Sequence, residues 1–423
     1  MALAIAALAV GAASLPWRPE RTAAPPHVTL AASGVGPLRA GAAAVTLELP
    51  GDVPIGGFAR LSYRSEGVRD PVGARALVLS VPGCKVALAS AEILLVPDAL
   101  EAAVLARVRD LGLSGLVLGA THTHAGPGGY WEHGLAERIA TGPYDARLRD
   151  LVAGAIADAI RRADAALAPA RLSVARGLAD DLARSRSGGA EDGRLTVIRV
   201  DREAGEPVAE LVVFGAHPTI LGKGNRRISG DWPGRFLALG RGVRLFFQGA
   251  LGDQSSEGPA AATPEAFAEA LSARVSALPP GKPDPAPALA YAAVEVPLPA
   301  PDPGAAPALL RRAARNLSAG AFPRSAVVEA VRIGEATLVA VPAEPVASVA
   351  AGWRASLPPG AEIVSLSGGY LGYVEEPARM ASGEGESVRT YFGADLARRL
   401  GEAARLGAGR VTAPPAVVPA RGR

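Results

Sequence analysis

The segment 119–130, GATHTHAGPGGY, carries the residue types best suited to binding a metal ion. Its histidines, His122 and His124, follow the strand-like run 116–118. Side chains of a strand repeat every two residues, so both imidazoles share one face if the strand continues through the motif. Binding sites of open α/β sheets lie at such strand ends. The motif therefore predicts a metal site, although a surface or hydrogen-bonded pair of histidines would have the same spacing.

Two later apolar runs also end in polar residues. The run 212–217, VVFGAH, ends at His217, and the run 246–256, FFQGALGDQSS, breaks into a Gly-rich loop with Asp253 and Ser255. Such a loop could present a hydroxyl and backbone N–H groups to a developing oxyanion. Each segment also has an ordinary interpretation, because a lone histidine is often a capping or core residue and a Gly-rich loop is often only a turn.

Apolar patterns predict the elements that position these residues. A strand at 85–90, a helix at 98–111 and a strand at 115–120 form a β-α-β unit. The fold class is therefore α/β, with mixed sheets and flanking helices. We further expect strands at 195–200, 209–214, 243–247, 291–297, 326–333 and 336–341, and helices at 146–167, 264–277 and 345–356.

Composition narrows the classes of partner and ligand. The chain has 423 residues, of which 49% are hydrophobic, and this is ample for a globular core. Its net charge is only +3, and the basic residues are scattered, which argues against nucleic acid as the partner. The single cysteine, Cys84, excludes an intrachain disulfide and a multi-cysteine zinc site. A metal would therefore be held by histidine, carboxylate or tyrosine.

The N-terminal run 1–15, MALAIAALAVGAASL, resembles the apolar part of a signal peptide or a short anchor. It is too short to span a bilayer comfortably. We expect a secreted or periplasmic protein, either cleaved or tethered by this segment. The expected organisation is a leader and spacer at 1–30, a single catalytic domain at 31–411 and a disordered tail at 412–423.

The motif THTHAGPGGY resembles the histidine motif of the neutral, non-lysosomal ceramidases, with Ala125 where that family usually has serine. Two features depart from the family: GDQSSE replaces its GDVSPN loop, and a tyrosine expected near Gly385 is absent. We also expect the catalytic part alone, without the family's immunoglobulin-like domain. The other matching segments, in chain order, are GVRDPVGARALVL (67–79), RLTVIRVDREAGEP (194–207), VVFGAHPT (212–219), LGDQSS (251–256), VPAEP (341–345) and GYLGYV (369–374).

The resemblance implies a site as well as a fold. In the family, two histidines, a glutamate and a tyrosine bind zinc and leave a position for water, whose pKa the metal lowers towards neutrality. A second histidine manages protons beside that water. Carried over to this sequence, the zinc ligands are His122, His217, Glu344 and Tyr373, the catalytic residues are His124, Asp253 and Ser255, and the substrate-binding residue is Arg184.

The resemblance also implies zinc-dependent hydrolysis of a linear amide. The expected substrate is an N-acyl sphingoid (ceramide-like) or related N-acyl lipid, giving fatty acid and amine, with peripheral membrane contact. One alternative is an amidohydrolase-type metal barrel, but its two further histidines would have to be His27 and His133. The other is a non-catalytic lipid- or glycan-binding protein on the same fold. Bound zinc together with amide hydrolysis separates an enzyme from the binding protein.

Overall fold

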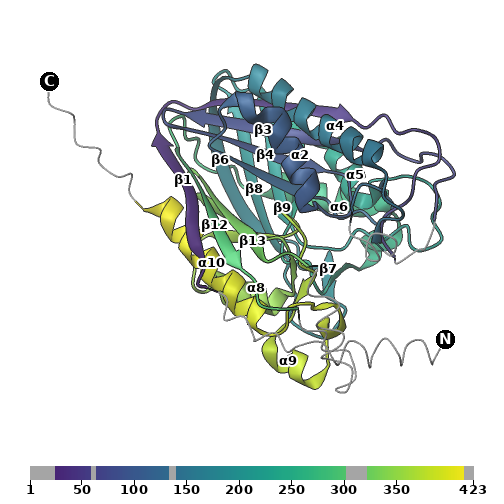
Figure 1. Ribbon diagram of the computed structural model, residues 1–423. Coiled ribbons are helices and arrows are strands. Elements are labelled where there is room, and N and C mark those ends of the chain that lie inside the picture. Colours follow the sequence, from purple (N-terminus) through teal and green to yellow (C-terminus); the bar gives the residue numbers. More distant parts are fainter. Residues whose placement is uncertain (1–23, 59–62, 133–139, 302–321, 414–423) are drawn as a thin grey trace, which may run out of the picture.

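The computed structural model describes residues 24–58, 63–132, 140–301 and 322–413 (Figure 1). Two β-sheets stack face to face, and helices cover the outer face of each sheet. The described chain therefore forms four layers, with two sheets between two layers of helices.

The larger sheet has eight strands in the order β10-β9-β8-β6-β2-β3-β4-β5. It is mixed: β4 and β5 are parallel, as are β9 and β10, whereas the strands between them are antiparallel. The strand bounds are β2 Arg39–Thr46, β3 Gly73–Val81, β4 Cys84–Ala91, β5 Gly115–Ala120, β6 Ala168–Leu178, β8 Arg194–Arg202, β9 Pro207–Phe214 and β10 Val243–Gln248.

The smaller sheet has five strands in the order β1-β12-β13-β14-β16. Two short strand pairs, β7 with β11 and β15 with β17, lie outside both sheets and carry residues of the candidate site. The bounds are β1 His27–Val35, β7 Ala183–Ser185, β11 Gln254–Ser256, β12 Ala288–Pro297, β13 Ser325–Ile333, β14 Ala336–Ala340, β15 Glu344–Pro345, β16 Ala361–Val364 and β17 Tyr373–Val374.

Helices α2 and α4 pack on the outer face of the larger sheet at β2 to β5, and α5 and α6 cover its other end. Helices α8 and α10 cover the smaller sheet. The bounds are α2 Asp98–Val108, α4 Ala146–Ala165, α5 Asp231–Ala238, α6 Pro264–Ala277, α8 Ala347–Arg354, α9 Pro377–Ser382 and α10 Asp395–Thr412, with short 3-10 helices at Arg109–Leu111, Pro259–Ala262 and Ser387–Arg389.

The contact between the sheets explains why the central strands are continuous apolar runs: Leu77 and Leu88 of the larger sheet and Val331 of the smaller one are fully buried in it. Gly115 permits a close approach, because a Cβ there would lie 2.3 Å from the ring of Tyr291. A side chain at this position would push the sheets apart.

The expected α/β class, with mixed sheets and flanking helices, is confirmed. The expected helix at 98–111 is α2 followed by a 3-10 turn, and the chain reverses at Gly112, where φ is +63°. Helix α5 was not predicted because Pro233 and Gly234 lie within it. Pro233 is in the first helical turn, where its missing N–H breaks no helical hydrogen bond. The open, stacked sheets also differ from the closed barrel of the amidohydrolase alternative.

The expected boundaries of the domain need correction at both ends. Residues 27–30 are not part of a spacer, because β1 begins at His27 and pairs with β12. Helix α10 continues to Thr412, one residue beyond the expected end of the domain. The apolar run 1–15, His133 and residues 414–423 lie outside the described residues. Within the described part of the chain, every helix is too short or too polar to cross a bilayer.

Candidate metal centre

A turn brings His122 to the candidate metal site. The expected continuation of the strand through this residue is not observed. Strand β5 ends at Ala120, and His122 has a φ of +68°, in the left-handed region that side chains other than glycine seldom adopt. Hydrogen bonds to two carbonyls after β4 hold it there, from its main-chain N to Ile93 O at 3.0 Å and between its Nδ1 and Leu94 O at 2.6 Å. Such strained residues cluster at functional sites.

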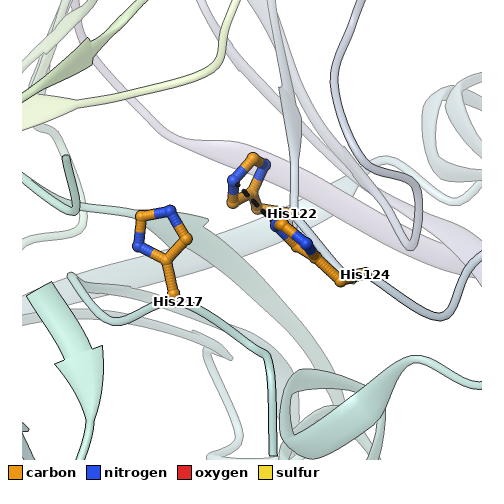
Figure 2. A group of neighbouring side chains, drawn as sticks. All are labelled: His122, His124 and His217. Carbon is orange, nitrogen blue, oxygen red and sulfur yellow. Dashed lines mark hydrogen bonds between the residues drawn. The ribbon is translucent and has the colours of Figure 1, made fainter. Parts of the chain in front are cut away.

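His217 lies just beyond the end of β9, close to the ring of His122 (Figure 2). Its main-chain N–H and its Nδ1 both bond to the carbonyl oxygen of Gln254, each at 2.9 Å. A carbonyl only accepts, so Nδ1 donates in His122 and in His217, and the Nε2 atom of each ring is the one that faces the rest of the group. Burial, aided by Arg186, lowers the pKa of His217 to about 4. Its ring is therefore neutral at physiological pH.

Glu344 lies between the two histidines. Its Oε2 is 3.2 Å from Nε2 of His217 and 3.5 Å from Nε2 of His122, and it accepts no hydrogen bond from the described residues. Its other oxygen, Oε1, accepts a hydrogen bond from the Tyr370 hydroxyl at 2.8 Å. Burial acts to raise the pKa of Glu344, but the neighbouring histidines outweigh it and hold this pKa well below its ordinary value. The carboxylate is thus ionised.

Tyr373 completes the group. It pairs with Glu344 in the β15–β17 ladder, and its hydroxyl lies 3.1 Å from Nε2 of His217. The same hydroxyl accepts a hydrogen bond from Arg186 Nη2 at 3.2 Å. Burial and the Glu344 charge raise the pKa of Tyr373 well above its ordinary value, and the Arg186 charge opposes them.

These residues fit a zinc ion. The Nε2 atoms of His122 and His217 converge on Glu344 Oε2, a buried oxygen with no hydrogen-bond partner among the described residues, and a cation bound between them would satisfy all three atoms. The separations of 3.1–3.5 Å also suit zinc, because ligands about 2.1 Å from a tetrahedral ion lie about 3.4 Å apart. Neutral imidazole, carboxylate and phenol oxygen are suitable zinc ligands.

His124 lies beside the proposed ligands. Its Nε2 is 3.4 Å from Nε2 of His122, and its Nδ1 is buried with no hydrogen-bond partner among the described residues. Burial, together with His122 and His217, lowers the pKa of His124 well below its ordinary value. Gly57 provides the space for this ring, since a Cβ there would be 2.7 Å from His124 Nδ1. His124 is thus a neutral base next to the metal-type ligands.

The structure brings Arg186 into the group, and not the expected Arg184. The side chain of Arg184 on β7 is 63% exposed and lies 3.5 Å from Glu191. Arg186, two residues later, donates to Tyr373, to Gly252 O at 2.8 Å and to Glu386 Oε1 at 2.8 Å. The sequence LARSRS contains both arginines, so residue type could not decide between them.

Asp253 and Ser255 lie next to the group. Asp253 is buried, and its oxygens accept hydrogen bonds from Ala347 N at 2.9 Å and Ser185 Oγ at 2.7 Å. The backbone of Ser255 forms a bridge with that of His217. No hydrogen bond joins the Ser255 hydroxyl to any described histidine, so the geometry supplies no base for it. Asp253 thus joins the segments of Ser185 and Ala347 through hydrogen bonds.

Sequence reasoning missed several other contributors. Tyr370 fixes the orientation of Glu344. The sequence could have indicated this role, because Tyr370 lies in the same GYLGYV segment as Tyr373. Leu94 and Gln254 contribute main-chain oxygens. Because every residue has such an oxygen, the sequence contained no signal for these two.

Comparison with known proteins adds an independent finding. Residues 40–238, a little under half of the chain, match the family model for the N-terminal part of neutral/alkaline non-lysosomal ceramidases. The chain is 32% identical over 131 residues to neutral ceramidase A of Dictyostelium discoideum and 30% identical over 200 residues to the neutral ceramidase of Mycobacterium tuberculosis. These matches span 27% and 41% of this chain but only 18% and 31% of the relatives.

Solved structures agree on the fold. A ceramidase complexed with C2 superposes with a TM-score of 0.75 at 17% identity, over 89% of this chain and 75% of that one. The crystal structure of neutral ceramidase from Pseudomonas aeruginosa gives a TM-score of 0.74 at 19% identity, over 89% and 74%.

The fold and the site together define a mixed α/β protein with a buried group of metal-type ligands. Within that class, residues 40–238 match the model of the neutral/alkaline non-lysosomal ceramidase family, and most of the chain has the fold of the solved ceramidase structures.

Proposed function

We propose that this protein is a zinc-dependent hydrolase of linear amides. The observation that carries the proposal is the convergence of Nε2 of His217 and Nε2 of His122 on the buried Glu344 Oε2, at 3.2 and 3.5 Å, while that oxygen accepts no hydrogen bond from the described residues. His122, His217, Glu344 and Tyr373 would hold the ion. Zinc bound there would polarise an amide carbonyl and make water a stronger nucleophile at neutral pH.

The surrounding residues have distinct proposed roles. His124 is placed to take a proton from water and return it to the leaving amine, because its ring is neutral and adjoins the ligands. Arg186 donates to the Tyr373 hydroxyl, which fixes this hydroxyl and places a positive charge beside the proposed ligands. Tyr370 holds Glu344 so that its Oε2 faces the histidines.

For the substrate we propose an N-acyl sphingoid or a related N-acyl lipid. The relatives' names and the resemblance of the motifs support this class. The test is hydrolysis of a fluorogenic N-acyl sphingosine, together with measurement of zinc by elemental analysis. We expect stoichiometric zinc, and loss of activity on chelation that is restored by added zinc. A protein that cleaves the substrate equally well after complete zinc removal would refute the proposal.

His124 and Ser255 provide a test of the nucleophile. Since no histidine of the described residues is bonded to Ser255, we expect water and not serine to attack. Ser255→Ala should lower kcat by about 10–1,000-fold through a lost donor, and His124→Ala should cost at least as much. Both variants should keep their zinc. Steady-state kinetics and elemental analysis check this, and a covalent acyl group trapped on Ser255 would contradict it.

We also propose that the protein acts outside the cytoplasm and in contact with a membrane surface, because residues 1–15 have the composition of a signal peptide and the proposed substrate is a lipid. Cell fractionation and N-terminal sequencing of the native protein test this. We expect an exported protein that is either cleaved near residues 13–15 or retained by the segment. An uncleaved cytosolic product would contradict it.

A further inference from the structure

The side-chain amide of Gln254 joins the metal centre to a neighbouring loop. Gln254 is fully buried, and its Oε1 accepts a hydrogen bond from Asp192 N at 3.1 Å. Its Nε2 donates to Ala190 O and to Asp253 Oδ1, each at 2.9 Å. The main-chain oxygen of the same residue accepts the two hydrogen bonds from His217. One residue thus contacts both the loop and a proposed ligand.

This loop, residues 185–192, carries Arg186 and is called here the arginine loop. Asp253 holds its first part: Ser185 Oγ donates to Asp253 Oδ2 at 2.7 Å, and Arg186 N donates to Asp253 O at 2.9 Å. Gln254 holds its last part through Ala190 and Asp192. Two consecutive residues therefore fix the loop at both ends, with Arg186 between them.

Hydrogen bonds to helix α8 also hold the last part of the arginine loop in place. The Asp192 carboxylate, mostly buried, accepts a hydrogen bond from Arg354 Nη2 at 2.5 Å. Arg354 in turn donates to the buried Glu362 at 2.9 Å. The N–H of Asp192 is therefore presented to Gln254 from a fixed position.

We propose that Gln254 is a positioning residue that holds Arg186 against Tyr373. This inference rests on the proposed function, because Tyr373 matters as a zinc ligand. Outer partners of metal ligands orient them and strengthen metal binding.

The decisive measurement is zinc affinity, determined by competition with a chelator. Gln254→Met keeps the length of the side chain and removes its three hydrogen bonds, and it should weaken zinc binding by roughly 10-fold, as loss of an outer partner does. If Gln254 acts through Arg186, the effects of the two substitutions should not add. The double variant Gln254→Met with Arg186→Gln should then bind zinc less than about 2-fold more weakly than Arg186→Gln alone. Equal losses in both backgrounds would refute the inference.

Tyr291→Phe is the matched control. It removes a buried hydrogen bond, from the Tyr291 hydroxyl to Glu329 Oε1 at 2.5 Å, between β12 and β13 of the smaller sheet and outside the arginine loop. It should lower the melting temperature without changing zinc affinity. A zinc affinity that falls as much in this variant as in Gln254→Met would show a general loss of stability and would contradict positioning by Gln254.

Amide hydrogen exchange of the zinc-free protein gives a readout that does not depend on the metal. Gln254→Met should speed exchange in peptides covering 185–193, whereas peptides covering the strands β8 and β9 should not change. Unchanged exchange in the loop would overturn the inference. A wild-type protein that binds no zinc would refute the proposed function but not the positioning of Arg186, which the exchange experiment tests by itself.

Discussion

Replacing His217 with alanine should abolish zinc binding and amide hydrolysis together and leave a folded protein. His217 is buried, and its Nε2 lies 3.2 Å from Glu344 and 3.1 Å from Tyr373, so its loss removes the ligand that contacts both oxygen donors. His122→Asn should have the same effect. Asparagine is the better replacement there because it tolerates the positive φ of His122 better than alanine. Elemental analysis, the amide assay and circular dichroism measure the three properties.

His27→Ala is the matched control for these variants. His27 lies on β1, its side chain is 59% exposed, and its Nε2 lies 3.8 Å from Glu295 Oε2. Zinc content and turnover should equal those of the wild type. A His217→Ala protein with stoichiometric zinc and normal turnover would show that the proposed centre is not the active site.

Much of the fold was predictable because its strands are long and apolar. The expected strands at 195–200, 209–214 and 326–333 correspond to β8, β9 and β13, whose residues are mostly buried. Period and hydrophobicity are local properties, so the sequence carries them directly. Helix α5 was missed because its Pro233 and Gly234 usually break helices. The N-terminal boundary was misplaced because β1 pairs with β12, some 260 residues away in sequence.

The candidate site was predictable in its residue types but not in its geometry. The structure brings His122, His217, Glu344 and Tyr373 together, but the route of His122 depends on a left-handed residue that no periodicity indicates. The choice of Arg186 over Arg184 depends on where β7 ends and on the contacts of Asp253 and Gln254. Such tertiary contacts are set by the whole fold, and local residue types do not record them.

Glu344→Gln should make the zinc-free protein more stable while it weakens zinc binding. In the wild type, Glu344 Oε2 faces Nε2 of His217 at 3.2 Å and Nε2 of His122 at 3.5 Å, and it accepts no hydrogen bond from the described residues. Tyr370 holds Oε1, so the amide nitrogen of glutamine would take the place of Oε2 and donate to His217. One new buried hydrogen bond is worth about 1 kcal/mol. Thermal unfolding of the zinc-free proteins measures this gain.

The same substitution should reduce zinc affinity by more than the roughly 10–100-fold that loss of an outer partner costs, because a charged ligand is lost. Glu210→Gln is the control, since this buried glutamate faces arginines instead, with Arg244 Nε at 2.8 Å. The Glu210→Gln substitution breaks the buried ion pair with Arg244. It should destabilise the protein by about 3–5 kcal/mol without changing zinc affinity. If Glu344→Gln instead destabilised the zinc-free protein as Glu210→Gln does, the histidines would have to be donating to Glu344 as imidazolium ions. The group would then be a buried ion-pair network rather than a metal site.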